Sequence, residues 1–139
     1  MVLLALAIFG GVIGCGGSSI KASTLVLSSS STKTASGSSV NLTATIASKG
    51  NPQGTVTFFD GTTALGSPVS VSNGLATLST TALPVGTHAI TAKYSGDRHT
   101  SASSSSNAIE QTITGTFTIN INATSGTLSE PLTIPATLN

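Results

Sequence analysis

Few side chains in this sequence could take part in acid–base or nucleophilic chemistry. The arrangement closest to a hydrolase triad would combine a serine with His99 and Asp97. These two residues lie on one short polar stretch, and no serine carries the glycine pattern of a strand–turn–helix nucleophile elbow. The other titratable side chains are scattered along the chain: Asp60, Glu110, Glu130, His88, Tyr94 and five Lys or Arg. The sequence therefore predicts a protein that is not an enzyme.

The composition also disfavours metal and nucleic-acid sites. Two histidines without cysteines or carboxylates at ligand spacing do not predict a zinc site. A weak calcium site at Asp60 or Asp97 stays open as an alternative, although neither loop clearly supplies the several oxygens that calcium requires. The net charge is +1, 6% of the residues are charged and no basic run occurs, so we expect no nucleic-acid partner. We expect no cofactor.

The N-terminal residues suggest an export signal. Val2–Gly14 is apolar throughout and ends at Cys15, the only cysteine. This run is shorter than the about 20 residues of a membrane span and suits a signal peptide over residues 1–14. The stretch Val12-Ile13-Gly14-Cys15 resembles a bacterial lipobox, which implies that Cys15 carries a lipid as the first mature residue. Residues 15–21 would then tether the protein to a membrane.

Two features of this N-terminal stretch depart from the lipobox family. No Lys or Arg precedes the apolar run, and Ile13 is bulkier than the residue usual at its position. The alternative interpretation is a buried strand or helix beside an incidental cysteine.

Beyond residue 21, short segments alternate between apolar and polar residues at intervals of about 8–12 residues, a pattern typical of a sandwich or barrel. Thr, Val and Ile favour strands, whereas Gly, Ser, Asn and Pro favour the turns between them. A single cysteine allows no intrachain disulfide, so the core alone must hold the domain together. We predict a polar loop over 30–39, turns at 60–61, 73–74 and 83–86, and about seven strands: 24–27, 40–46, 55–59, one or two short strands within 64–71, 75–80, 87–94 and 107–114.

Several polar and aromatic side chains in these segments are expected to serve the fold. His88 shares a predicted strand face with Ile90 and Tyr94, so its imidazole should lie at one end of the sandwich and bond a loop carbonyl. Tyr94 should be a core ring whose hydroxyl is satisfied near the following loop. Asp97 should close a turn through its own backbone. Phe59 falls on the solvent side, where it either caps the hairpin or is an exposed contact residue.

Three stretches resemble one known family, the group 3 bacterial Ig-like repeats. Residues 54–61, GTVTFFDG, are similar to the family's GTVTFYDG and include Asp60 and Gly61. Residues 74–78 resemble its GxATL motif. Residues 83–97 follow its L-x-x-G-x-H-x-I-x-A-x-Y-x-G-D pattern, with matching residues at Gly86, His88, Tyr94, Gly96 and Asp97. The resemblance covers residues 22–114 and implies an all-β, immunoglobulin-like Greek-key sandwich without catalytic residues.

The same resemblance implies a place outside the cell, because members occur in bacterial surface and secreted proteins as scaffolding or adhesive modules. With a lipid on Cys15, the chain would be an exported spacer in the cell envelope, or part of a larger repeat protein, with neighbouring Ig-like modules as partners. Residues 115–139 resemble the start of a truncated second module, or form a tail. The alternative function is an accessory module that binds a surface protein or a glycan, although the chain has no Trp and only one Tyr.

Overall fold

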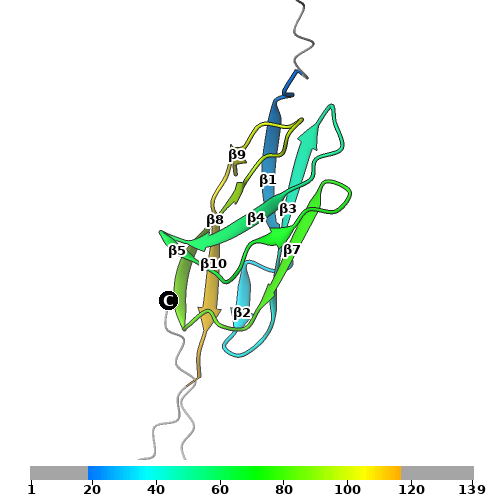
Figure 1. The fold of residues 1–139 in the computed structure, drawn as a ribbon. Coiled ribbons are helices and arrows are strands. Elements are labelled where there is room, and N and C mark those ends of the chain that lie inside the picture. The colour runs from blue at the N-terminus through cyan, green and yellow to red at the C-terminus, as the bar shows by residue number, and fades with distance from the viewer. Residues whose placement is uncertain (1–18, 117–139) are drawn as a thin grey trace, which may run out of the picture.

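The computed structural model describes residues 19–116, and all regular secondary structure in that part of the chain is β-strand (Figure 1). No helix within it is long and apolar enough to cross a membrane. The predicted signal peptide, Cys15 and nearly all of the C-terminal segment lie outside the described residues. The strands are β1 (Ser23–Ser29), β2 (Lys33–Ala35), β3 (Val40–Ser48), β4 (Thr55–Asp60), β5 (Thr63–Ala64), β6 (Val69–Ser70), β7 (Leu75–Thr80), β8 (Gly86–Tyr94), β9 (Ser103–Ser104) and β10 (Ile109–Thr114).

These strands form two sheets that enclose one core (Figure 1). The smaller sheet has the order β1-β3-β7 and is antiparallel. The larger sheet has the order β2-β10-β8-β4-β5, with β6 beside β4 and β9 beside β8. The chain passes from one sheet to the other after β1, β2, β3, β6 and β7. The predicted all-β sandwich is confirmed.

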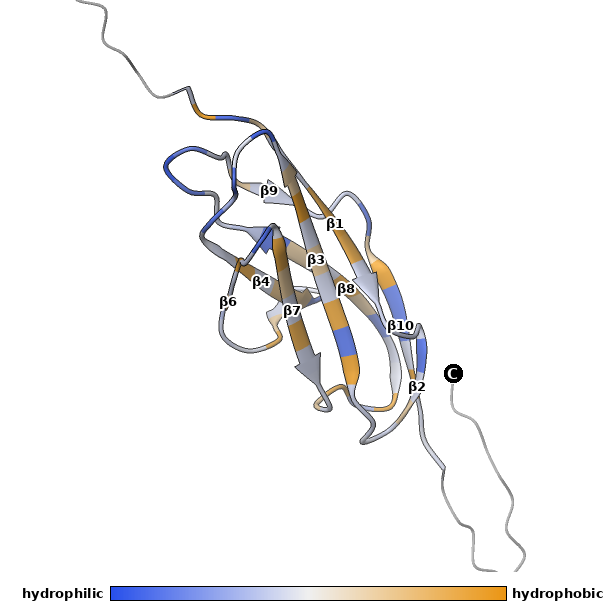
Figure 2. Cartoon of the chain, turned by 90° about the vertical axis from the view of Figure 1, so that its right-hand side faces the viewer, coloured by the Kyte–Doolittle hydropathy of each residue, from blue (hydrophilic) through white to orange (hydrophobic). Residues whose placement is uncertain are grey.

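The core follows from the period-two alternation of the longer strands. In β3, Val40, Leu42, Ala44 and Ile46 are buried, whereas the residues between them face outward. Figure 2 shows this alternation as orange bands separated by paler or blue ones along β3. The larger sheet contributes the opposite wall of the core, and burying each of its large apolar side chains contributes about 1.5–3 kcal/mol. Its buried members are Val56, Phe58, Ile90, Ala92, Tyr94 and Ile113.

Two short strands lie where the sequence predicted only loops. β2 falls within the predicted polar loop 30–39 and pairs with β10 in parallel, with Thr34 opposite Ile113. β9 falls in the serine-rich segment between the predicted strands 87–94 and 107–114, and it pairs Ser103 with Tyr94 of β8. Both strands are too short to show an alternating pattern, and they form because the neighbouring strands offer unpaired backbone groups. Neither could be found from local sequence.

The predicted turns at 60–61 and 73–74 are present. Asn73 and Gly74 have φ values of 51° and 76°, which is the left-handed geometry that a two-residue hairpin turn requires. Ser72 and Leu75 close this turn with a reciprocal pair of backbone hydrogen bonds of 2.8 and 2.9 Å. Gly61, with φ of 56°, leads from β4 into β5. The turns therefore fix which residues lie opposite one another in the flanking strands.

Candidate functional site

The polar side chains that the sequence singled out gather in two clusters at opposite ends of β8. The first cluster surrounds His88, whose side chain points inward from the start of the strand and is 8% exposed. Nδ1 of His88 lies 2.7 Å from Oδ2 of Asp60, at the end of β4. Nε2 lies 2.9 Å from the carbonyl oxygen of Pro84, in the loop before β8. The predicted loop carbonyl is thus that of Pro84, and Asp60 is a second partner that the sequence did not reveal.

These two contacts favour the cationic form of the imidazole. A carboxylate and a carbonyl oxygen can only accept, so both contacts are hydrogen bonds when each ring nitrogen carries a hydrogen, as in the protonated ring. Desolvation by burial lowers the pKa of His88, but the hydrogen bonds to Pro84 and Asp60 outweigh it, and the net pKa is raised. With both nitrogens engaged, the ring has none free to accept a proton from a nucleophile. The cluster joins the β4–β5 hairpin to the loop before β8.

Gly86 opens β8 beside this cluster. Its φ of 140° is a conformation that residues with a side chain rarely adopt, whereas a Cβ at this position would meet no atom within 4 Å. The requirement for glycine is therefore conformational and not steric. It allows the chain to turn from the loop at Pro84 into β8.

The second cluster surrounds Asp97, just beyond the other end of β8. One carboxylate oxygen accepts the backbone N–H groups of His99 and Thr100, both at 2.7 Å. The other accepts the N–H of Gln53 at 2.6 Å and the hydroxyl of Tyr94 at 3.1 Å. The backbone donors, led by Gln53 and His99, lower the pKa of Asp97 to about 2. Asp97 therefore closes a turn, and it also joins the segment before β4 to the loop after β8.

Tyr94 connects this cluster to the core. Its ring is buried among the apolar side chains, and its single hydroxyl proton is shared between the carbonyl oxygen of Gln53 and the Asp97 carboxylate. Burial and the neighbouring Asp97 carboxylate raise the pKa of Tyr94 to about 12. Gly96 lies in the turn between them, where a Cβ would approach the backbone N of Ala102 to 2.7 Å. The turn can therefore close this tightly only with glycine at position 96.

The contacts of the Asp97 carboxylate decide whether it could also serve a catalytic triad or bind calcium. An aspartate carboxylate offers about four acceptor positions, and three backbone N–H groups and the shared Tyr94 hydroxyl occupy those of Asp97. Neither a catalytic histidine nor a calcium ion would find an unused position on this carboxylate. Across residues 19–116, no group of three or more His, Cys, Asp or Glu side chains could hold a metal ion.

One polar residue that the sequence prediction missed lies in the core of the larger sheet. Gln111 of β10 is fully buried. Its Oε1 accepts the hydroxyl of Ser29 at 2.9 Å, and its Nε2 donates to the hydroxyl of Thr34 at 3.3 Å. It therefore connects β10 with both β1 and β2. In the predicted strand 107–114, Gln111 falls on the same face as Ile109 and Ile113, and this was the available signal.

Phe59 has features of a hairpin cap and of a contact residue, the two roles predicted for it. The side chain is half-buried and lies opposite Ala64 in the β4–β5 hairpin. The Lys93 ammonium lies 5.2 Å from the centre of its ring, within the range of a cation–π interaction. The other two aromatic side chains of the described residues, Phe58 and Tyr94, are buried.

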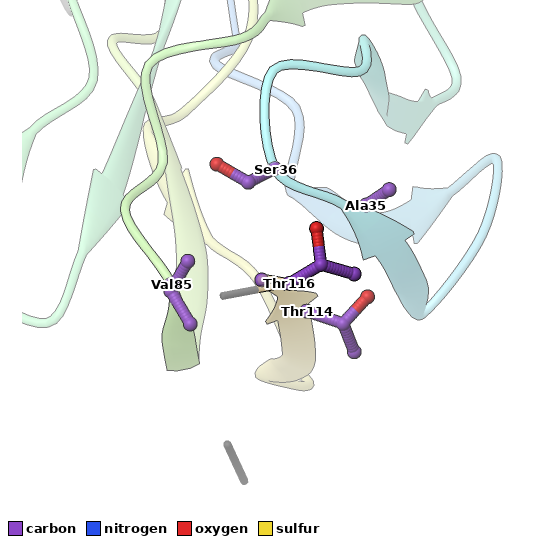
Figure 3. A pocket seen from close by; sticks show the side chains of 6 residues that line it. Ala35, Ser36, Val85, Thr114 and Thr116 are labelled. Carbon is purple, nitrogen blue, oxygen red and sulfur yellow. The ribbon is translucent and has the colours of Figure 1, made fainter. Parts of the chain in front are cut away.

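A hollow of about 250 Å³ lies where the described chain leaves the sandwich (Figure 3). None of its lining residues is charged, so the hollow offers no acid–base or metal chemistry. Gly115 lies so close to Val85 that a Cβ would approach the Val85 side chain to 2.8 Å. Val85 itself is 40% exposed. The lining residues are Ala35, Ser36, Val85, Thr114, Gly115 and Thr116.

The chain matches a known protein family. A protein-family model described as "Bacterial Ig-like domain (group 3)" matches residues 27–114, the part of the chain that holds both polar clusters and the core. No curated protein matches the chain.

Proposed function

This chain belongs to the group 3 bacterial Ig-like domain family, and on that premise we propose that it is a non-catalytic spacer or adhesive module, anchored to the cell envelope by a lipid on Cys15. Domains of this family are generally extracellular or surface-exposed structural modules, and they are typically non-catalytic. The lipid would fix the N-terminal end, so that the sandwich and any neighbouring module stand away from the membrane.

The observation that supports a structural role is that the main ionisable side chains are hydrogen-bonded to other parts of the fold. His88 donates from both ring nitrogens within the fold, and Asp97 accepts from four donors within the fold. Asp97 is the carboxylate on which a triad with His99, or a calcium site at this loop, would have depended. The use of His88 and Asp97 as internal connections supports a module whose task is to keep its shape.

The course of the chain supports a place in a linear arrangement. The described chain enters the sandwich at one end and leaves it at the opposite end (Figure 1). Modules joined in this way contact only their neighbours along the chain. The uncharged hollow around Val85 and Gly115 lies at the exit, where a following module would begin.

The lipid anchor can be tested by mass spectrometry. The full chain and a Cys15→Ser variant are expressed in a bacterium, and each is isolated from both the membrane and the soluble fractions. We expect the parent chain to begin at Cys15 with a diacylglyceryl group on its Sγ atom, and the variant to lack the group and to leave the membrane fraction. Recovery of the parent chain with an unmodified Cys15 would overturn the anchor.

A surface position needs a separate measurement. Protease added to intact cells should degrade the sandwich, and cells without the chain should show no corresponding fragments. Complete protection in intact cells, with degradation after lysis, would contradict exposure at the cell surface.

A further inference from the structure

The outer edge of β7 is a row of backbone groups without partners in the described part of the chain. Ile46 donates its N–H to the carbonyl of Gly74. The backbone N–H and C=O groups of the even-numbered residues of β7 therefore bond β3, and those of the odd-numbered residues point away from β3. Leu75 is the exception among the odd-numbered residues, because its N–H and carbonyl bond Ser72 in the turn. The N–H and C=O groups of Thr77 and Ser79 are left without partners among the described residues, and we call these four groups the β7 edge.

The edge is open because β6 lies elsewhere. β6 follows β5 and precedes β7 in the chain, but it pairs with β4 of the larger sheet and not with β7. Thr77 and Ser79 are accordingly exposed. No hydrogen bond from another part of residues 19–116 reaches their backbone groups.

The opposite edge of the same sheet is closed. The side chain of Asn107 bonds both the N–H and the carbonyl of Leu27, and the N–H of Ser106 bonds the carbonyl of Leu25. Ser101 accepts the N–H of Ser23. The segment before β10 thus covers β1 along its length, whereas nothing comparable covers β7 among the described residues.

β7 also lacks the features with which proteins usually protect an edge strand, namely charged residues, proline and bulges. Its sequence, LATLST, contains no charged residue and no proline. The outer face beside it is uncharged as well, and Val26, Thr45 and Leu75 lie in one row across the three strands. Val26 and Leu75 are 52% and 46% exposed.

We propose that the β7 edge binds the β7 edge of a second copy of this chain, so that the two small sheets become one continuous sheet. An edge paired with itself about a two-fold axis is necessarily antiparallel. Centring the axis on Leu78 places Thr77 opposite the partner's Ser79 and uses all four free groups on each copy. Centring it on Thr77 would instead place Ser79 opposite the partner's Leu75, whose backbone groups are already bonded in the turn.

The absence of charge favours a second copy over an unrelated strand as the occupant. Identical strands bring identical side chains together, and like charges facing each other across a ladder are destabilising. Leu75–Thr80 can face its own copy without any such repulsion. An unrelated strand that carries charged residues would find no opposite charge on this edge.

Antiparallel pairing also sets the orientation of the two molecules. Since β7 runs along the long direction of the sandwich (Figure 1), the N-terminal ends of two paired copies point in opposite directions. Copies anchored on facing surfaces could pair in this way. This step rests on the proposed surface function, whereas the pairing itself does not.

Pairing can be measured by sedimentation of the full chain from micromolar to millimolar concentration. We expect reversible dimers in the parent chain. Thr77→Lys/Ser79→Lys places like charges opposite each other at both pairs and should weaken dimerisation about tenfold or more. Thr77→Glu/Ser79→Lys changes the same positions but places opposite charges together, and it should dimerise at least as well as the parent chain.

Two controls keep this result specific. Thr43→Lys/Thr45→Lys adds the same charges to β3 on the same face, away from the edge, and should not prevent dimerisation. Hydrogen exchange of the parent chain should show slower exchange of the Thr77 and Ser79 amides as concentration rises. All variants are compared by circular dichroism and thermal unfolding, so that loss of folding is recognised.

Each outcome decides the proposal. A monomeric parent chain at millimolar concentration would overturn it. So would equal weakening by both β7 double variants, or exchange at Thr77 and Ser79 that does not depend on concentration. In a dimer where β7 of one copy paired with a different segment of the other copy, amides outside β7 would also be protected. That result would overturn the proposal as well. Because the measurement is made in solution, an unmodified Cys15 would remove the anchor without affecting this result.

Discussion

The His88 imidazole donates from both of its nitrogens, whereas a catalytic histidine must keep one nitrogen available to exchange a proton. Its acceptors are Asp60, at the end of β4, and Pro84, in the loop before β8, so the ring holds these two segments together. The cation that this arrangement requires is stabilised by the Asp60 carboxylate 2.7 Å away. At the scale of single residues, the proton on His88 therefore contributes to folding.

A dependence of stability on pH follows from the raised pKa of His88. A group whose pKa is higher in the folded state contributes its full stabilisation below the unfolded-state value of 6.5, and loses it as pH rises through the folded-state value. We expect the free energy of unfolding, measured with urea, to fall as pH rises above 6.5. Asp60→Asn should cost about 1–2 kcal/mol at pH 6 and less at pH 8.

The control for this pH dependence is His88→Gln, which removes the titrating group and should flatten this part of the profile. If the parent chain and His88→Gln showed the same slope between pH 6 and pH 8, the assignment of the effect to His88 would be wrong.

At the scale of elements, Gln111 decides how β10 is joined to β1 and β2. Both of its partners, Ser29 and Thr34, are half-buried hydroxyls that could turn to water if the amide were removed. Gln111→Leu keeps most of the volume and should cost about 1 kcal/mol or less. Gln111→Ala leaves a cavity as well and should cost about 2–4 kcal/mol. Urea unfolding measures both values.

The difference in unfolding free energy between the two variants separates the contribution of packing from that of the hydrogen bonds. Equal large losses in Gln111→Leu and Gln111→Ala would show that the hydrogen bonds, and not the packing, carry most of the stabilisation at this position.

How far these elements could be predicted depended on their length. β3 and β8 alternate over nine residues each, and the pattern identified the strands and their buried faces. β2 has three residues and exists only because β10 pairs with it, and that partner is distant in sequence. The period-two argument therefore had nothing to detect in the loop over residues 30–39.

The candidate site was predictable to the same limited degree. The position of His88 on the inward face of β8 predicted a loop carbonyl as partner, but not which one. Asp60 as the second partner depends on the register between β4 and β8, which places Asp60 opposite Ile90. Local sequence does not fix that register. The open edge of β7 also depends on tertiary structure, because it results from β6 joining the other sheet.

At the scale of the whole molecule, the direction of the chain through the sandwich matters most. The described chain enters beside the first residues of β1 and leaves after β10 at the other end (Figure 1). Next to the exit, β2 lies parallel to β10, with Lys33, Thr34 and Ala35 opposite Thr112, Ile113 and Thr114. The first and last parts of the domain are thus hydrogen-bonded directly to each other.

Tension between the two ends would act on this parallel pair in shear. Pulling on the N-terminal end draws β2 one way, and pulling on the C-terminal end draws β10 the other, so the bonds between them must break together instead of one at a time. Thr34→Pro removes an N–H from this ladder, at a cost of about 1–3 kcal/mol in equilibrium stability. We expect it to lower the unfolding force of the domain in single-molecule pulling from its two ends.

Thr63→Pro in β5, at the opposite edge of the same sheet, is the matched control and should leave the unfolding force nearly unchanged. If both substitutions lowered the force equally, the β2–β10 pair would not be the element that resists. A domain that resists in this way would stay folded while it transmits a mechanical load between whatever is attached at its two ends.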